Sequence, residues 1–213
     1  MLNRKNIVIN HLNQYYTIYI FTIILFLTGV IFGAIIVNSM LFEQKENLFF
    51  YLERFFLHFL PDNEMASTDL FKNAMLYHIQ FLAVLFFLGL AVIGLPIIWV
   101  LLFVKGVAIG FTVGFFVSQI GVKGLVLSFS AIAAQNMLII PIYIIASAFS
   151  MIFSFTLLQS IFSKRYKLPV MQVFYRYLIV FVILAIASTV AAGLESIVSF
   201  NAMQVMSDYF IKK

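Results

Sequence analysis

The sequence predicts an all-α, polytopic membrane protein with about five transmembrane helices, and three observations support this fold class. Of the 213 residues, 64% are hydrophobic and only 10% are charged. The mean hydropathy is +1.09. A water-soluble domain is roughly half apolar and about a quarter charged, so this composition does not suit a surface that faces water. The few charges are also unevenly spaced, which leaves long apolar intervals, and we expect a single integral membrane domain over residues 1–213.

Charge-free intervals locate the five expected spans, because a helix needs about 20 apolar residues to cross ~30 Å of hydrocarbon. We expect spans at about 16–40, 77–104, 105–122, 137–163 and 176–200. The first contains an apolar run, from Thr17 to Val37, that is too long for a cleaved signal sequence. The third is short, but Lys105 and Lys123 at its ends can extend toward opposite interfaces.

The fourth interval, residues 124–163, is about twice as long as one crossing requires. Gln135, Asn136 and Pro141 interrupt its first half, where irregular backbone must be buried in protein or face water. Its length alone allows one span, a re-entrant turn followed by a span, or two spans. The basic segment that follows it favours one span preceded by an interfacial or re-entrant piece near 125–135.

The positions of basic residues predict the orientation, because Lys and Arg accumulate in short cytoplasmic segments. The N-terminal tail and the loop 164–175 carry basic residues and no acidic ones, so both are expected inside. The loop 43–76 has six acidic residues against three basic ones and is expected outside. We therefore expect a cytoplasmic N-terminus. The side of the C-terminus stays open, because the chain ends in two lysines that oppose an outside position.

An amphipathic helix is expected in the outside loop, where apolar residues recur at three- and four-residue steps. Such a helix lies on the membrane surface or packs over the bundle. Alternatively, it offers a docking surface to an extracytoplasmic partner. The residues expected to bind a partner in that case are Leu48, Leu52, Glu53, Arg54, Phe55, Phe56 and Phe59.

Glycines at four-residue spacing are expected to pack helices against one another. Lipid provides little hydrophobic drive between helices, so close contact through small residues takes its place. The first expectation is packing within one subunit, and the alternative is a contact between subunits of a homo-oligomer. The glycines are Gly29 and Gly33 in the first span and Gly106, Gly110 and Gly114 in the third.

Polar residues inside the expected spans are candidate functional residues, because such side chains are costly in lipid. Lys105 is expected to anchor the chain by extending to the inner interface. Glu195 is expected to form a buried structural hydrogen bond, with interfacial exposure or a direct contact to a partner or ion as alternatives. Gln135 and Asn136 are expected to form hydrogen bonds between helices, or else to line a cavity.

The sequence offers no pattern for catalysis, metal binding or nucleic-acid binding. It has no Cys, its three His residues fall in different segments, and it contains neither an H-E-x-x-H motif nor a phosphate-binding loop. We therefore expect no enzyme activity, no cofactor and no bound metal. The net charge of +5 comes from few charged groups and favours contact with the lipid bilayer rather than nucleic acid.

Four segments in this order are similar to a known family: residues 29–39 (GVIFGAIIVNS), 94–98 (GLPII), 105–115 (KGVAIGFTVGF) and 135–141 (QNMLIIP). Over nearly its whole length the chain resembles the stage II sporulation protein M family of endospore-forming bacteria. Glu195 matches a glutamate common in the last span of that family. Where family members often have Pro-His-Gly followed by Glu, this chain has Ala134, Gln135, Asn136 and Met137.

The resemblance implies a multi-pass protein of the bacterial cell membrane, on the mother-cell side of the sporulation septum. It also implies assembly with stage II sporulation proteins D and P. The expected function is a noncatalytic scaffold that localises and organises peptidoglycan-remodelling proteins during engulfment of the forespore. The alternative, which follows from the residues alone, is a channel or transporter whose cavity is lined by Gln135, Asn136, Glu195 and Lys105.

Overall fold

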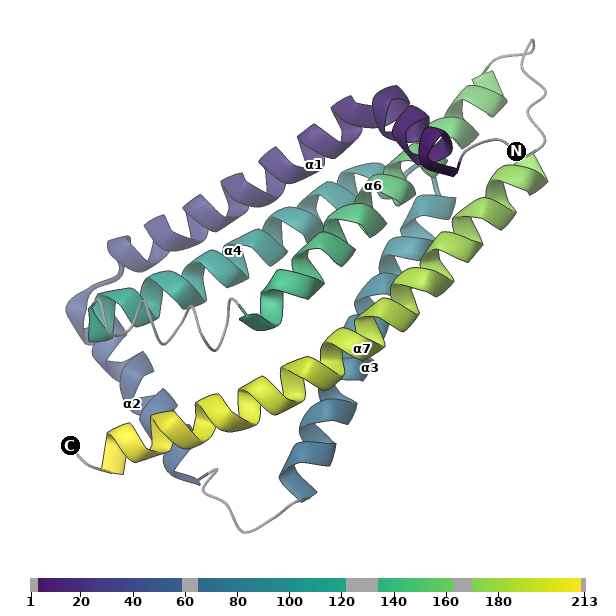
Figure 1. Cartoon of the computed structure of the whole chain (residues 1–213). Coiled ribbons are helices and arrows are strands. Elements are labelled where there is room, and N and C mark those ends of the chain that lie inside the picture. The colour runs from purple at the N-terminus through teal and green to yellow at the C-terminus, as the bar shows by residue number, and fades with distance from the viewer. Residues whose placement is uncertain (1–3, 59–64, 122–133, 163–169, 212–213) are drawn as a thin grey trace.

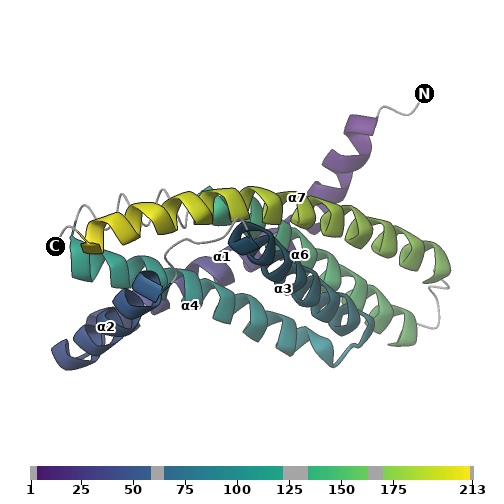
Figure 2. The ribbon, with the colours of Figure 1, turned by 90° about the horizontal axis from the view of Figure 1, so that it is seen from below.

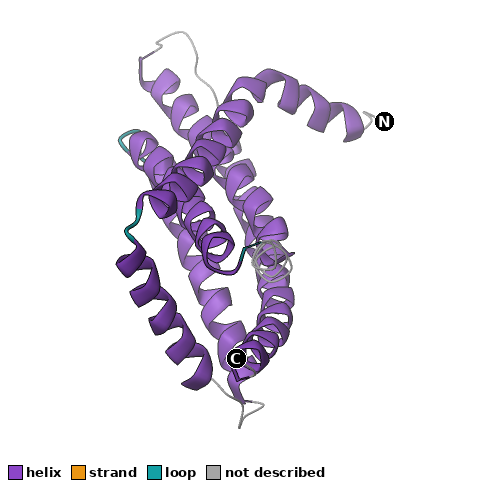
Figure 3. Ribbon diagram, turned by 90° about the vertical axis from the view of Figure 1, so that its left-hand side faces the viewer, coloured by secondary structure: helices purple, strands orange, loops and turns teal. Residues whose placement is uncertain are grey.

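The computed structural model describes residues 4–58, 65–121, 134–162 and 170–211, and nearly all of these residues are helical, with no strand among them (Figures 1 and 3). The helices are α1 (Arg4–Ser39), α2 (Phe42–His58), α3 (Met65–Leu90), α4 (Gly94–Ile120), α6 (Ala134–Phe162) and α7 (Val170–Ile211). Segments long and apolar enough to cross a membrane lie at Asn13–Ser39, Phe71–Leu90, Gly94–Gln119, Leu138–Ser160 and Met171–Ser196. The predicted polytopic helical membrane protein is confirmed.

Helix α6 lies at the centre of the bundle, where it packs against α1, α3, α4 and α7. Its span has the largest buried share of the five. Figures 1 and 2 show α1 beside α4 on one flank, and α3 beside α7 on the other. The N-terminal end of α1, the α3–α4 turn and the facing ends of α6 and α7 lie at one end of the bundle, whereas α2 and the C-terminal end of α7 lie at the other (Figure 1).

The chain turns between its second and third spans at residues 91–93, not at Lys105 as the charge spacing predicts. Backbone N–H groups of Ala91 and Gly94 donate to the carbonyls of Leu88 and Ala91 at 3.1 and 2.9 Å. A Cβ on Gly94 would lie 2.7 Å from the carbonyl carbon of Leu88, so this approach requires glycine. Pro96 follows in the first turn of α4, where its missing N–H has no intrahelical partner to lose. Charge spacing misplaces the boundary because a tight turn needs no charged residue.

The last helix is longer than the sequence predicts. It begins at Val170, within the expected inside loop 164–175, and continues past the expected end at residue 200 to Ile211. At 1.5 Å per residue, its 42 residues extend about 63 Å, or roughly twice the hydrocarbon thickness, so the helix tilts or projects from the bilayer. The interfacial or re-entrant piece expected near 125–135 lies almost wholly outside the described residues.

Near its N-terminus, α1 is interrupted at Tyr15, which has φ −116° and ψ 17°. The turns before this residue point away from the rest of the bundle (Figure 2). The part of α1 that packs against the other helices is therefore the apolar segment that follows, which is the expected first span.

Helices α1 and α4 run parallel and touch through glycines. A Cβ added to Gly110 would lie 2.8 Å from Cα of Val30, and one added to Gly33 would lie 2.6 Å from the backbone nitrogen of Phe111. No side chain fits between the two backbones at these positions, and this close contact is the usual substitute for hydrophobic drive in lipid. The seam lies within one subunit. Its facing positions are Gly29 and Gly106, Gly33 and Gly110, and Ala34 and Gly114.

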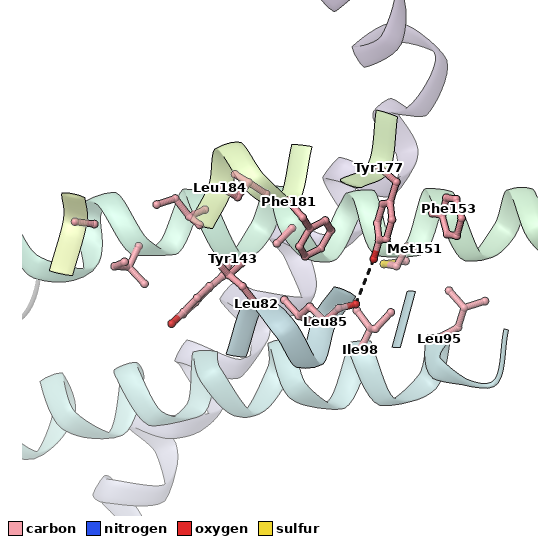
Figure 4. Close-up of a cluster of buried hydrophobic side chains, with 14 residues drawn as sticks. Leu82, Leu85, Leu95, Ile98, Tyr143, Met151, Phe153, Tyr177, Phe181 and Leu184 are labelled. Atoms are coloured by element: carbon pink, nitrogen blue, oxygen red, sulfur yellow. Dashed lines mark hydrogen bonds between the residues drawn. The ribbon is translucent and has the colours of Figure 1, made fainter. Parts of the chain in front are cut away.

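An aromatic core joins α3, α6 and α7 (Figure 4). The ring of Tyr177 stacks on Phe86 and Phe153, with centroid separations of 5.0 and 4.4 Å. The Tyr177 hydroxyl donates to the carbonyl oxygen of Phe86 at 2.9 Å, and the Ser150 hydroxyl donates to that of Leu85 at 2.9 Å. These contacts attach the last turns of α3 to both neighbouring helices.

Candidate functional site

Side chains from four helices meet in one group within the membrane-spanning region, which we call the polar cluster. Helix α3 contributes two adjacent residues, and α4, α6 and α7 contribute one each. Polar and ionisable side chains at such depth are costly, so their convergence marks this place as the candidate functional site. The members of the polar cluster are Tyr77, His78, Lys105, Tyr143 and Glu195.

His78 connects three of the helices through both of its ring nitrogens. Its Nε2 lies 2.6 Å from Oε2 of Glu195, and its Nδ1 lies 2.6 Å from the hydroxyl oxygen of Tyr143. An ionised carboxylate only accepts hydrogen bonds, so Nε2 donates to an ionised Glu195. In a neutral imidazole, Nδ1 then accepts the hydroxyl proton of Tyr143. His78 and Tyr143 are buried, while the Glu195 side chain is 25% exposed.

The ammonium group of Lys105 rests against aromatic rings. Its Nζ lies 4.0, 4.7 and 5.2 Å from the ring centroids of Tyr77, Phe81 and Tyr143, and it also donates to the Tyr77 hydroxyl. Such cation–π contacts contribute roughly 0.5–2 kcal/mol each, depending on desolvation. Among side chains that the structure describes, no carboxylate lies within 4.0 Å of this ammonium group. Lys105 is thus a cation stabilised by aromatic faces and a hydroxyl.

Lys105 lies near the middle of α4, which differs from its expected place at the inner interface. It comes eleven residues after Gly94 and fourteen before Gln119. These separations correspond to about 16 and 21 Å along the helix axis, more than the ~6 Å reach of a lysine side chain. Lys105 is misplaced in the sequence analysis because the turn that precedes α4 is misplaced.

Of the other polar residues expected within the membrane, the structure describes the side-chain contacts of Glu195 but not those of Gln135 and Asn136. Glu195 forms a hydrogen bond to His78 on another helix. Gln135 and Asn136 lie in the first turn of α6, and their side chains are outside the described part of the chain. The structure therefore brings Glu195 and Lys105 to the same cluster.

Helix α2 contacts α4 and α7 and leaves much of its apolar surface exposed. Leu48 and Leu52 are half-buried, whereas Tyr51 is 69% exposed. The Arg54 guanidinium lies 4.5 Å from the ring centroid of Phe50 on the same helix. The remaining residues of the expected docking surface have side chains outside the described part of the chain; they are Glu53, Phe55, Phe56 and Phe59.

The sequence analysis missed three members of the polar cluster, Tyr77, His78 and Tyr143, and all three form its hydrogen bonds. His78 could have been found from the sequence, because it is an ionisable residue inside the charge-free interval 73–104. Glu195 was chosen as a candidate for the same reason, namely that an ionisable side chain within a span is costly in lipid. Nothing in the sequence distinguishes Tyr143, since it is one of ten tyrosines in an aromatic-rich chain and belongs to no recognisable motif. Only the packing of α6 against α3 shows its role.

The polar cluster can join helices, hold a proton between His78 and its partners, or present the Lys105 cation within the membrane. Among the described residues, no group of three or more His, Asp or Glu side chains is arranged to hold a metal.

Comparison with protein families gives a match over most of the chain. Residues 22–200 match the model of the family described as Stage II sporulation protein M. The matched region includes most of the first candidate span, the other four completely, and all five members of the polar cluster. No curated protein and no solved structure is significantly similar to the chain.

Proposed function

The chain belongs to the stage II sporulation protein M family, and we propose that it is a noncatalytic membrane scaffold that localises and organises peptidoglycan-remodelling proteins during forespore engulfment. The family match over residues 22–200 carries the proposal, because it connects a multi-pass membrane protein to sporulation. The proposed partners are stage II sporulation proteins D and P. The proposed location is the mother-cell side of the septum, with the N-terminus in the cytoplasm.

The hydrogen bonds of the polar cluster support a noncatalytic role. A general base needs a lone pair within hydrogen-bond reach of the substrate proton. His78 uses both ring nitrogens to bond side chains on α6 and α7. The Lys105 ammonium is likewise held by Tyr77. These groups therefore stabilise the arrangement of the helices.

The exposed surface of α2 supports docking at the end of the bundle opposite the N-terminus. Phe42 and Tyr51 are 78% and 69% exposed, and Glu43 and Glu46 are exposed on the same helix. An apolar surface bordered by charge is typical of helices that bind a partner groove or a membrane surface. We propose that α2 contacts the extracytoplasmic parts of the partners.

Co-purification in mild detergent tests the scaffold. The partners would be recovered with the wild-type chain, with a double charge reversal on α2, Glu43→Lys and Glu46→Lys, and with a control reversal at the other end of the bundle, Arg176→Glu. We expect the α2 variant to recover less partner, and the control to match the wild type. Equal recovery with the α2 variant would reject α2 as the contact, and no recovery with the wild type would reject the scaffold.

A channel or transporter is the second candidate, and the polar cluster favours it, because ionisable side chains within spans often line the pathways of transported ions or protons. Liposomes that contain the purified chain would be assayed for proton and cation flux. Flux that disappears in Glu195→Ala, with the fold retained, would favour transport. Flux equal to that of empty liposomes would exclude transport of these ions.

A further inference from the structure

We propose that Lys105 binds a membrane-spanning helix of a partner protein, and that this helix carries an Asp or Glu at the same depth as Lys105. The inference rests on the proposed function, since it specifies how a scaffold holds a partner inside the bilayer. It concerns the surface shared by α3 and α4 around Lys105 and Tyr77, which is separate from α2.

Lys105 has no direct carboxylate partner within the described part of the chain. Charged side chains in membrane spans almost always pair with one another or face a polar interior. Here the ammonium has only three aromatic rings and one hydroxyl as partners, and no described carboxylate within 4.0 Å. A carboxylate would add direct charge attraction, which is strong in a low-dielectric medium, to the existing cation–π contacts.

Glu195, the acidic member of the same cluster, does not provide this partner. Its Oε2 is bonded to Nε2 of His78 at 2.6 Å. Tyr143 links the two groups indirectly, since its ring faces Lys105 while its hydroxyl bonds the Nδ1 of His78. Lys105 and Glu195 therefore form no direct ion pair, and a second copy of this chain would present a glutamate already engaged by its own histidine.

The surface around Lys105 is open to a neighbouring helix. Lys105 is half-buried, and Tyr77 is 55% exposed. On α3, Val84 lies two helical turns after Tyr77 and is 46% exposed, and on α4 Ala108, three residues after Lys105, is exposed. These apolar residues can pack against a transmembrane helix. Lys105 would favour a helix that carries a negative charge opposite it.

The position of Lys105 near the middle of α4 favours a helix rather than a lipid headgroup as the occupant. The ammonium is attached about 16 Å from one end of α4 and about 21 Å from the other end of its span. Phosphate groups lie outside the ~30 Å hydrocarbon layer, so they do not reach this position. A carboxylate that enters the layer must be carried there by a membrane-spanning segment.

The test uses the full-length chain in phosphatidylcholine vesicles at pH 8 and synthetic membrane-spanning peptides. Each peptide is a Leu-Ala helix of about 22 residues with flanking lysines and a single central Glu or Gln. Association is measured by energy transfer between labelled chain and labelled peptide. We expect the Glu peptide to bind about tenfold more tightly than the Gln peptide, since polar contacts between membrane helices have roughly that effect.

Substitutions at Lys105 assign the preference to this residue. Lys105→Met is expected to abolish it and Lys105→Arg to retain it, while Lys72→Met, five residues before Tyr77 on α3, is the control that leaves it unchanged. Lys105→Glu is expected to prefer a peptide with a central Lys. Because Lys105→Met could fail to fold, the retained preference in Lys105→Arg and the reversed preference in Lys105→Glu provide independent readouts.

Three results would overturn the inference: equal binding of Glu and Gln peptides to the wild type, an undiminished preference in Lys105→Met, or Lys105-dependent association of the chain with itself in place of the peptide.

Co-purification of stage II sporulation proteins D and P separates this inference from the scaffold. If both partners are recovered by the wild type and equally by folded Lys105→Met, the scaffold stands and the inference about its contact fails. If the wild type binds the Glu peptide but recovers neither protein, the scaffold with these partners fails while the acidic-helix site stands.

Discussion

The glycine seam between α1 and α4 predicts that one added methyl group destabilises the bundle. In Gly110→Ala the new Cβ would lie 2.6 Å from the carbonyl carbon and 2.8 Å from Cα of Val30. An unstrained carbon–carbon contact is about 3.5–4.0 Å, so the helices must separate by roughly 1 Å. Overpacking of this kind costs about 1–3 kcal/mol, while alanine gains up to ~1 kcal/mol over glycine in helix propensity. We expect a net loss of about 1–2 kcal/mol in the free energy of unfolding.

Two further glycines provide a graded comparison. A Cβ at Gly114 would lie 3.3 Å from Cα of Ala34, so Gly114→Ala should cost less than Gly110→Ala. A Cβ at Gly193 would lie 3.7 Å from its nearest neighbour, Cε2 of Phe71, which is an ordinary contact. Gly193→Ala is the matched control and should equal or exceed the wild type in stability.

The assay is reversible unfolding in mixed micelles, with sodium dodecyl sulfate as the denaturant and tryptophan fluorescence or circular dichroism as the signal. The expected order of stability is Gly193→Ala, then Gly114→Ala, then Gly110→Ala. Wild-type stability in Gly110→Ala, or a greater loss in Gly193→Ala than in Gly110→Ala, would refute the parallel α1–α4 seam.

Three other predictions concern the polar cluster, the aromatic core and the topology. His78→Ala leaves two hydrogen-bond partners unpaired, so the same assay should show a loss of about 1–2 kcal/mol, and unchanged stability would contradict the cluster geometry. Tyr177→Phe removes the bond to the carbonyl of Phe86 but keeps the ring stack, so we expect a loss of about 0.5–1.5 kcal/mol, and no loss would mean that the bond contributes nothing. Because the chain has no native Cys, Glu46→Cys should react with a membrane-impermeant maleimide on intact cells and Ile93→Cys only after permeabilisation; the opposite result would reverse the predicted orientation.

Much of the fold follows from the sequence because lipid imposes strong constraints on it. Backbone groups in a bilayer must be satisfied within the segment, so long apolar intervals can only be helices. The spacing of Gly106 and Gly110 also marks a helix face where backbones approach closely, and that face packs on α1. Such properties depend on residue type and local spacing, both of which a single sequence displays.

The polar cluster could not be assembled from the sequence, because it depends on where the chain turns. Placing the turn at Lys105 puts that residue at an interface, whereas the turn at residues 91–93 puts it near the middle of α4. The local signal was present in Gly94 and Pro96, but apolar turn residues are indistinguishable from span residues when only charge is counted. The pairing of His78 with Glu195 also joins residues 117 positions apart, which no periodicity reveals.

The location of the partner proteins in sporulating cells tests the central claim most directly. Fluorescent fusions of stage II sporulation proteins D and P would be imaged in cells that produce or lack this chain, with the level of each fusion measured in parallel. The scaffold account predicts that both fusions concentrate at the septum when the chain is present and spread through the membrane when it is absent, at equal levels. Unchanged concentration of both fusions at the septum in cells that lack the chain would contradict it.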